Sequence, residues 1–131
     1  MIGQDLSERN IERTKKDWPD ANAEYLLGDE SGKLLVEDDS LDGFIASEVC
    51  EHMTDEELVI VVNEIKRTLK SDSFAYITFP YHENLERSTH FCPNCETKFH
   101  TWGHKQSWNS EHIKSVFNGF SQIKIRRFIS L

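Results

Sequence analysis

The segment LDGFIASEVCEHMTDEELVIVVNEIKRTL, residues 41–69, carries the clearest structural signal in the chain, a strand followed by an amphipathic helix. Residues 41–47 include the apolar run Phe44-Ile45-Ala46, which predicts a buried strand. Thr54 and Glu57 form a Thr-x-x-Glu capping box, the signature of a helix N-terminus. The residues that then recur at helical spacing and give the helix one apolar face are Leu58, Val61, Val62, Ile65 and Leu69.

Strands and helices alternate on both sides of this unit. The expected elements, in chain order, are a strand ending at residues 2–3, a helix over 8–17 capped by Ser7, a strand over 23–27, a strand over 74–79 ended by Pro80, a short helix capped by Asn109 or Ser110, and a last strand with Ile123, Ile125 and Phe128. Residues 81–108 show little periodicity. The alternation predicts βαβ units, and therefore an α/β fold with a mostly parallel sheet.

The bulk properties fit one cytoplasmic domain. The length of 131 residues suits a single domain, and no run of 18 apolar residues predicts a membrane span. The start, MIGQD, lacks the basic and apolar parts of a signal peptide. Three cysteines, two of them spaced Cys-x-x-Cys, favour a reducing compartment over a disulfide framework.

Charge is distributed unevenly along the chain. Residues 1–91 hold 9 basic and 21 acidic side chains, whereas residues 92–131 hold 6 and 2. The acidic first part works against nonspecific binding of nucleic acid, which needs a basic surface. The basic tail either meets an anionic substrate or complements the chain's own acidic part, and we favour the second interpretation.

Acidic residues follow three of the expected strands. Asp5, Asp29 and Glu48 each stand where a strand reaches its carboxyl end, the edge at which open parallel sheets bind ligands. A carboxylate after one strand can accept hydrogen bonds from both ribose hydroxyls of a nucleoside, and a carboxylate after the next can accept from an adenine amino group. The pattern alone also fits solvated loop ends.

Four segments together resemble the class I S-adenosylmethionine-dependent methyltransferases of the type 11 and 12 kind. They are Gly3-Gln4-Asp5-Leu6-Ser7-Glu8, Leu27-Gly28-Asp29, the run from Leu41 to His52, and Glu64-Ile65-Lys66-Arg67-Thr68-Leu69-Lys70. The resemblance extends over about residues 2–80 and rests on the order and spacing of the motifs. It implies a Rossmann-like sheet and methyl transfer to a small or polar acceptor.

The resemblance also implies roles for individual residues. Asp5 would bind the ribose, Gly28 with Asp29 and Glu30 would hold the adenine, and Ser47 would lie near the sulfonium. The catalytic residues would be Glu48, Glu51 and His52.

One part of the family pattern has no counterpart. The family's first strand and its G-x-G-x-G loop, which lie in the middle of the sheet, are missing, so residues 1–131 are expected to form one partial, N-terminally incomplete domain. The absence would leave two unpaired strand edges. Methyl transfer would then require the missing segment, or a second copy of the chain that completes the sheet.

The run Glu48-Val49-Cys50-Glu51-His52 offers two carboxylates and an imidazole, a set that suits Mg²⁺ or a harder transition ion. It resembles the metal-binding motif of ubiquinone-pathway O-methyltransferases and small-RNA 3′-end methyltransferases. The alternative, which we favour, is that His52 only begins a helix. Cys50 is expected to be a small core residue.

Residues 84–108 form a Cys/His-rich insert in this interpretation. Cys92, Cys95, His100 and His104 follow the pattern C-x₂-C-x₄-H-x₃-H, which is close to zinc-knuckle spacing and predicts one tetrahedral Zn²⁺. The alternative is a metal-free lid over the acceptor. A rival function follows from the same segment, namely a non-catalytic, degenerate methyltransferase-like module whose zinc knuckle binds RNA or protein.

Overall fold

The computed structural model describes residues 1–128 as a mixed α/β structure. Its strands and helices are β1 (Ile2–Asp5), α1 (Glu8–Asp17), β2 (Glu24–Leu27), β3 (Leu41–Ser47), α2 (Asp55–Thr68), β4 (Leu69–Thr78), β5 (Thr89–Phe91), β6 (Lys98–His100) and α3 (Ser110–Val116), with short 3₁₀ turns η1 (Cys50–His52) and η2 (Leu85–Ser88). This order confirms the predicted α/β class.

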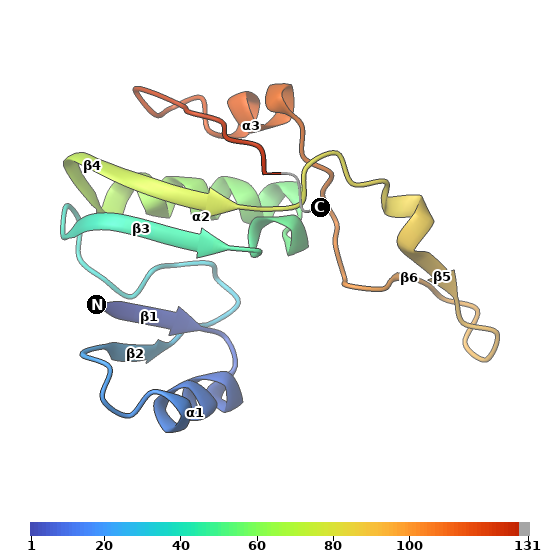
Figure 1. Ribbon diagram of the computed structural model, residues 1–131, viewed down its shortest axis with the longest axis horizontal. Coiled ribbons are helices and arrows are strands. Elements are labelled where there is room, and N and C mark those ends of the chain that lie inside the picture. Colours follow the sequence, from blue (N-terminus) through green and yellow to red (C-terminus); the bar gives the residue numbers. More distant parts are fainter. Residues whose placement is uncertain (129–131) are drawn as a thin grey trace.

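The strands form separate pairs. β1 pairs in parallel with β2, β3 pairs in parallel with β4, and β5 forms an antiparallel hairpin with β6. The arrows of β1, β3 and β4 point the same way, so the carboxyl ends of both parallel pairs lie at one edge of the molecule (Figure 1). Within residues 1–128 no strand lies between β1 and β3, and the facing edges of these two strands stay unpaired.

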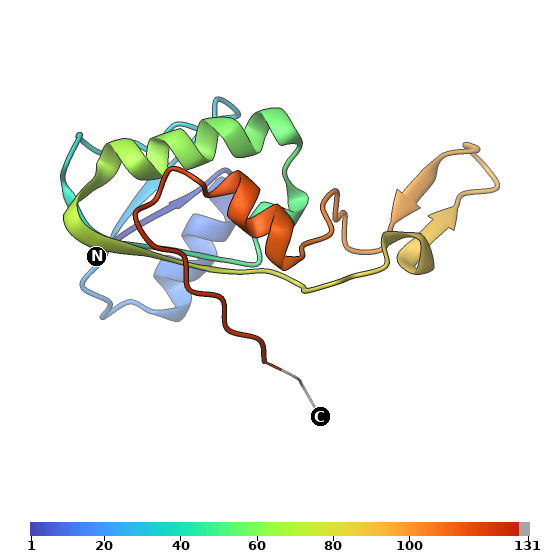
Figure 2. The same ribbon diagram turned by 90° about the horizontal axis from the view of Figure 1, so that it is seen from above.

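The β3–β4 pair carries the core. α2 packs along one face of this pair and α3 lies beside α2 (Figure 2). The capping box predicted at the start of α2 is present in both directions, between Thr54 and Glu57. The buried residues that form one apolar cluster are Cys50, Leu58, Val62, Trp108, Ile113 and Phe117.

The opposite face of the same pair is uncovered. Ile45, Phe74 and Tyr76 occupy neighbouring positions on it, since Gly43 pairs with Phe74 and Ile45 with Tyr76. Their exposed fractions are 71%, 61% and 52%. A buried strand pair of an α/β fold normally has helices on both faces, so this face lacks half of its cover.

β4 contains a bulge near its start. Leu41 pairs with Leu69, but Gly43 already pairs with Phe74, so the register shifts between these two pairs. Residues 70–73 of β4 thus stand where β3 has only Asp42, and they include Asp72 with a φ of 64°. From Phe74 onward the register is regular to the Ser47–Thr78 pair.

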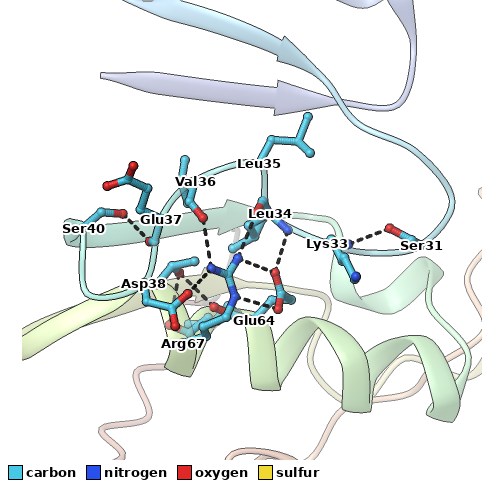
Figure 3. A network of polar contacts seen from close by, with 12 residues as sticks. Ser31, Lys33, Leu34, Leu35, Val36, Glu37, Asp38, Ser40, Glu64 and Arg67 are labelled. Atoms are coloured by element: carbon cyan, nitrogen blue, oxygen red, sulfur yellow. Dashed lines mark hydrogen bonds and ion pairs between the residues drawn. The ribbon is translucent and has the colours of Figure 1, made fainter.

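The loop between β2 and β3 is tied to both halves of the structure. Arg67 of α2 donates to the carbonyl oxygens of Leu34 (2.9 Å) and Val36 (3.0 Å) and to the Asp38 carboxylate (2.6 Å), and it forms a two-pronged pair with Glu64 (2.9 and 2.6 Å; Figure 3). Hydrogen bonds from the Arg67 guanidinium hold the pKa of Glu64 below its usual range.

On its other side the loop meets β1. The Gln4 side chain donates to the carbonyl oxygen of Lys33 (2.8 Å) and accepts from the amide of Leu35 (2.9 Å). The loop therefore joins the β1–β2 pair to α2 through backbone groups.

Two expectations were wrong. Residues 122–128 form no strand, although Ile123 and Ile125 still pack against the core cluster, so their apolar character reflects burial and not pairing. The segment 81–108, expected to lack regular structure, contains the β5–β6 hairpin, which projects from the rest of the molecule (Figures 1 and 2). Antiparallel pairs of three residues leave too little sequence for a periodic pattern.

None of the helices within residues 1–128 has both the length and the apolar character that crossing a membrane requires.

Replacing Thr54 with Ala should lower the free energy of unfolding by about 1 kcal/mol, because the Glu57 amide loses its capping oxygen. Urea unfolding followed by circular dichroism measures this change. Glu56, exposed in the same turn, provides the control: Glu56→Gln should change stability much less. Equal losses in both variants would contradict the role of the cap.

Replacing Arg67 with Lys should release residues 34–38 while leaving α2 folded. A single ammonium group cannot donate all the hydrogen bonds that the planar guanidinium makes to this loop and to Glu64. Hydrogen exchange followed by mass spectrometry should show faster exchange of the Leu34 amide, which donates to Glu64. Unchanged protection in this loop would refute the anchoring role. Lys70→Arg, at an exposed pair with Asp42, is the control substitution.

Candidate functional site

The carboxyl ends of the parallel strands carry the acidic residues that the sequence singled out. Asp5 ends β1, Asp29 follows β2 by two residues, and Glu48 follows β3 directly. All three side chains are exposed, and Figure 1 shows that β1 and β3 end at the same edge. The geometry thus places polar groups on neighbouring strand ends, where parallel sheets bind their ligands.

Asp5 is held by the first turn of α1. Its Oδ1 accepts a hydrogen bond from the Ser7 amide (2.7 Å), and the Asn10 side chain donates to both oxygens at 3.3 Å. Ser7 caps the helix in turn, by accepting from the Asn10 amide. The carboxylate is therefore fixed beside a helix N-terminus, with its outer side open to solvent.

At Gly28 the chain after β2 lies close to the carboxyl end of β1. Its amide donates to the Asp5 carbonyl oxygen (2.9 Å), and a Cβ at this position would lie 2.8 Å from Nε2 of Gln4. Because the Gln4 amide is already engaged by the following loop, a larger residue would displace it. Asp29 then accepts from the Ser31 amide (2.9 Å), and hydrogen bonds from Ser31 lower the pKa of Asp29. Glu30 is exposed.

A cluster of hydroxyl and carboxylate groups lies at the carboxyl ends of β3 and β4. The Thr78 hydroxyl lies 2.8 Å from the Ser47 hydroxyl and donates to Oε1 of Glu48 at 2.9 Å. Glu48 adopts a φ of 55°, in the left-handed region that a residue with a side chain rarely enters. Strained backbone of this kind gathers at binding and catalytic sites.

Glu51 and His52 lie in η1, just beyond this cluster. Glu51 is fully buried, whereas His52 is exposed. Burial raises the pKa of Glu51. One ligand atom each from Glu51, His52 and His104 lies within 4.8 Å of the others.

His100 and His104 of the projecting segment lie next to Glu83 and not next to the cysteines. His104 Nδ1 lies 2.5 Å from one Glu83 oxygen, and His100 Nε2 lies 3.5 Å from the other. Within residues 1–128, the groups of three or more side chains close enough to share an ion are Glu83 with His100 and His104, and Glu51 with His52 and His104. The structure therefore does not bring Cys92, Cys95, His100 and His104 together as the expected tetrad.

Cys92 and Cys95 lie in the turn of the β5–β6 hairpin. The Cys92 amide donates to the Thr97 carbonyl oxygen (2.9 Å), and the Glu96 amide donates to the Cys92 carbonyl oxygen (2.8 Å). Hydrogen bonds from Thr97 and from Cys92 lower the pKa of Cys95 to about 7. By contrast, burial raises the pKa of Cys50 to about 12, which agrees with its expected place in the core.

The sequence of residues 1–77 matches the methyltransferase domain family. The chain belongs to this family. The match covers β1 to β3, α2 and β4 up to its last residue but one, and it includes every expected cofactor-binding residue, while the Cys/His-rich segment follows the matched residues.

Several solved structures share the fold of this chain. The PH0226 protein of Pyrococcus horikoshii OT3 is 19% identical, with a TM-score of 0.69 over 100% of this chain and 69% of that one. A chain from the complex of the Haloferax volcanii Trm112 methyltransferase activator with a methyltransferase is 22% identical (TM-score 0.66; 90% and 48%). A SAM-dependent methyltransferase of Archaeoglobus fulgidus is also 22% identical (TM-score 0.62; 90% and 48%).

This methyltransferase chain thus spans about half the length of two of these neighbours. No curated protein matches its sequence.

Several residues of the site were not predicted from the sequence. Thr78 and Asn10 position acidic residues that were predicted, and Glu83 lies beside two histidines, hydrogen-bonded to His104 and 3.5 Å from His100. Glu83 stands alone in an aperiodic segment, so no local pattern could have identified it. Thr78 at the end of a strand, beside the end of β3, could have been found from the expected pairing of the two strands.

In metal-free protein, iodoacetamide should modify Cys95 much faster than Cys50. The rate at Cys95 should rise with pH through about 7, because the thiolate is the reactive form and its share grows as pH passes the pKa. Cys50, buried with a pKa of about 12, should react only after unfolding. Mass spectrometry of alkylated peptides from pH 5 to 9 measures both. Equal rates at the two sites would contradict the structure, and Thr97→Val should shift the Cys95 profile to higher pH.

Proposed function

We propose that this methyltransferase domain binds S-adenosylmethionine at the strand ends and transfers its methyl group to a small or polar acceptor. The observation that supports the proposal best is the placement of Asp5, Asp29 and Glu48 at the carboxyl ends of parallel strands. Family membership supplies the chemistry of the cofactor.

Each strand end would hold a different part of the cofactor. Asp5, fixed by Ser7 and Asn10, presents its free side to the ribose hydroxyls. Gly28, Asp29 and Glu30 would receive the adenine, and the tight turn at Gly28 keeps side chains away from the ring.

The reacting end would lie near Ser47 and Glu48. S-adenosylmethionine supplies an electrophilic methyl group on a positively charged sulfur, and the acceptor attacks in line with the bond that breaks. The chain's residues hold the partners in position and receive the proton that the acceptor loses. Glu48, Glu51 and His52 are the groups proposed for these roles; Glu48 and His52 are exposed and therefore accessible, whereas Glu51 is buried.

The site would be completed by a further parallel strand with a glycine-rich loop, seated between β1 and β3. One feature favours it: the facing edges of β1 and β3 are unpaired within residues 1–128. The apolar face with Ile45, Phe74 and Tyr76 would be covered by a helix and not by this strand, so it favours a segment that brings a helix as well. Another segment or a second copy of the chain could supply the strand.

A non-catalytic binding module is the second candidate. Phe91, Phe99 and Trp102 expose 56%, 51% and 68% of their surface on the projecting segment, and aromatic side chains of this kind stack on unpaired bases or pack against protein. For a zinc knuckle, however, His100 and His104 would have to leave Glu83 and turn toward the cysteines.

Calorimetry with S-adenosylmethionine tests the proposal. We expect the chain alone to bind more weakly than micromolar, and a fusion that adds a methyltransferase first strand and glycine-rich loop to bind at micromolar concentration. In that fusion Asp5→Asn should weaken binding about 10- to 100-fold, the loss of a hydrogen bond to a charged group. Asp20→Asn, away from the strand ends, is the matched control.

A folded fusion that binds no S-adenosylmethionine would overturn the proposal. If it also bound single-stranded RNA or a protein through Trp102, the second candidate would replace it.

A further inference from the structure

We infer that Glu51, His52 and His104 form a binding site for one divalent transition ion, with Glu83 behind His104 as its supporting carboxylate. The site joins two regions that lie far apart in the sequence, η1 and the segment after the hairpin.

Glu51 is the first argument. Its side chain is fully buried, and neither carboxylate oxygen has a hydrogen-bond partner within residues 1–128. A buried carboxylate without a partner is costly, and buried charges in proteins are normally paired or coordinate metals. His52 and His104 supply nitrogen atoms within 4.8 Å of it.

The hydrogen bonds of His104 are the second argument. Its Nδ1 lies 2.5 Å from a Glu83 oxygen. In the neutral tautomer that donates its Nδ1 proton to this carboxylate, Nε2 keeps a free electron pair. Metal-bound histidines commonly make this contact, in which a carboxylate holds the nitrogen that does not face the ion. Glu83 therefore prepares His104 to bind an ion on the side of Glu51 and His52.

The neighbouring group of Glu83, His100 and His104 suits this supporting role better than coordination. His100 Nδ1 accepts from the amides of Trp102 and His104, both at 3.2 Å, so its proton sits on Nε2. Nε2 faces Glu83 at 3.5 Å and has no free electron pair for a cation.

The backbone fixes the geometry of the site. The amides of Lys105 and Gln106 both donate to the Glu51 carbonyl oxygen, at 2.7 and 3.1 Å, which holds His104 next to η1. Gly103, with a φ of 73°, lies beside the His52 ring, where a Cβ would be 3.7 Å from Nδ1, an ordinary van der Waals contact. The segments that carry the ligands are thus joined by backbone hydrogen bonds.

Two imidazoles and one carboxylate favour a first-row transition ion such as Zn²⁺ over Mg²⁺, which prefers oxygen ligands and keeps its waters. Three protein ligands leave an open position on the ion. Its use, to orient an oxygen of the methyl acceptor, rests on the proposed function; the binding of the ion does not.

The test is zinc binding by the full chain after chelation and removal of free metal. We expect one equivalent of Zn²⁺ by elemental analysis and a higher melting temperature with added Zn²⁺. Glu51→Gln and His52→Ala should abolish both effects, and Glu83→Gln should weaken binding about 10- to 100-fold. His52 is exposed, so its replacement decides the matter even if Glu51→Gln disturbs the fold.

The double variant Cys92→Ser, Cys95→Ser is the matched control and should bind zinc like the unaltered chain. Bound Co²⁺ should show no absorption from thiolate ligands. Less than a tenth of an equivalent of zinc, or binding that the cysteine variant loses while Glu51→Gln and His52→Ala retain it, would overturn the inference. Because S-adenosylmethionine binding is measured separately, failure of one result leaves the other standing.

Discussion

Arg67 uses all five of its N–H groups, and through them α2 holds the loop that separates the two strand pairs. The loop accepts hydrogen bonds from Arg67 at Leu34 and Val36, and it meets Gln4 at the residues that flank Leu34. In an extended segment, successive backbone groups point to opposite sides, as they do in a strand. The loop can therefore bind Arg67 on one side and Gln4 on the other. The relative position of Asp5 and Glu48 therefore depends on a guanidinium that touches neither.

A second connection places the projecting segment. The amides after His104 bind η1, and Trp108 stacks on Phe79 at a centroid distance of 4.3 Å, fully buried in the core. The base of this segment is thus part of the folded domain, although the hairpin itself stands clear of it. Glu83 and the histidines lie at that base, which is why they can approach residues of the strand ends.

How much of the fold and the site could be predicted from the sequence depends on how far apart along the chain the interacting residues lie. The α2 capping box, the Ser7 cap of α1 and the strand at residues 41–47 follow from local patterns, and all three are confirmed. The strand was predicted to be buried, however, and Ile45 is 71% exposed because no helix covers that face. The family resemblance extended the prediction to the strand ends. The association of His104 with Glu51 is not predictable in this way, since it joins residues 53 positions apart through backbone hydrogen bonds. Regular Cys and His spacing suggested a shared ion, but Cys92 and Cys95 lie in the turn of the hairpin, while His100 and His104 lie beside Glu83.

The bulge in β4 also bears on how sequences of this type can diverge. In a regular strand, one inserted residue would send every later side chain to the opposite face. Here residues 70–73 already lie outside the regular pairing, so a change in their number can be absorbed before Phe74. Insertions and deletions can therefore occur at the amino end of β4 while Thr78 stays opposite Ser47. The part of the strand that tolerates changes in length is thus separate from the part that serves the site.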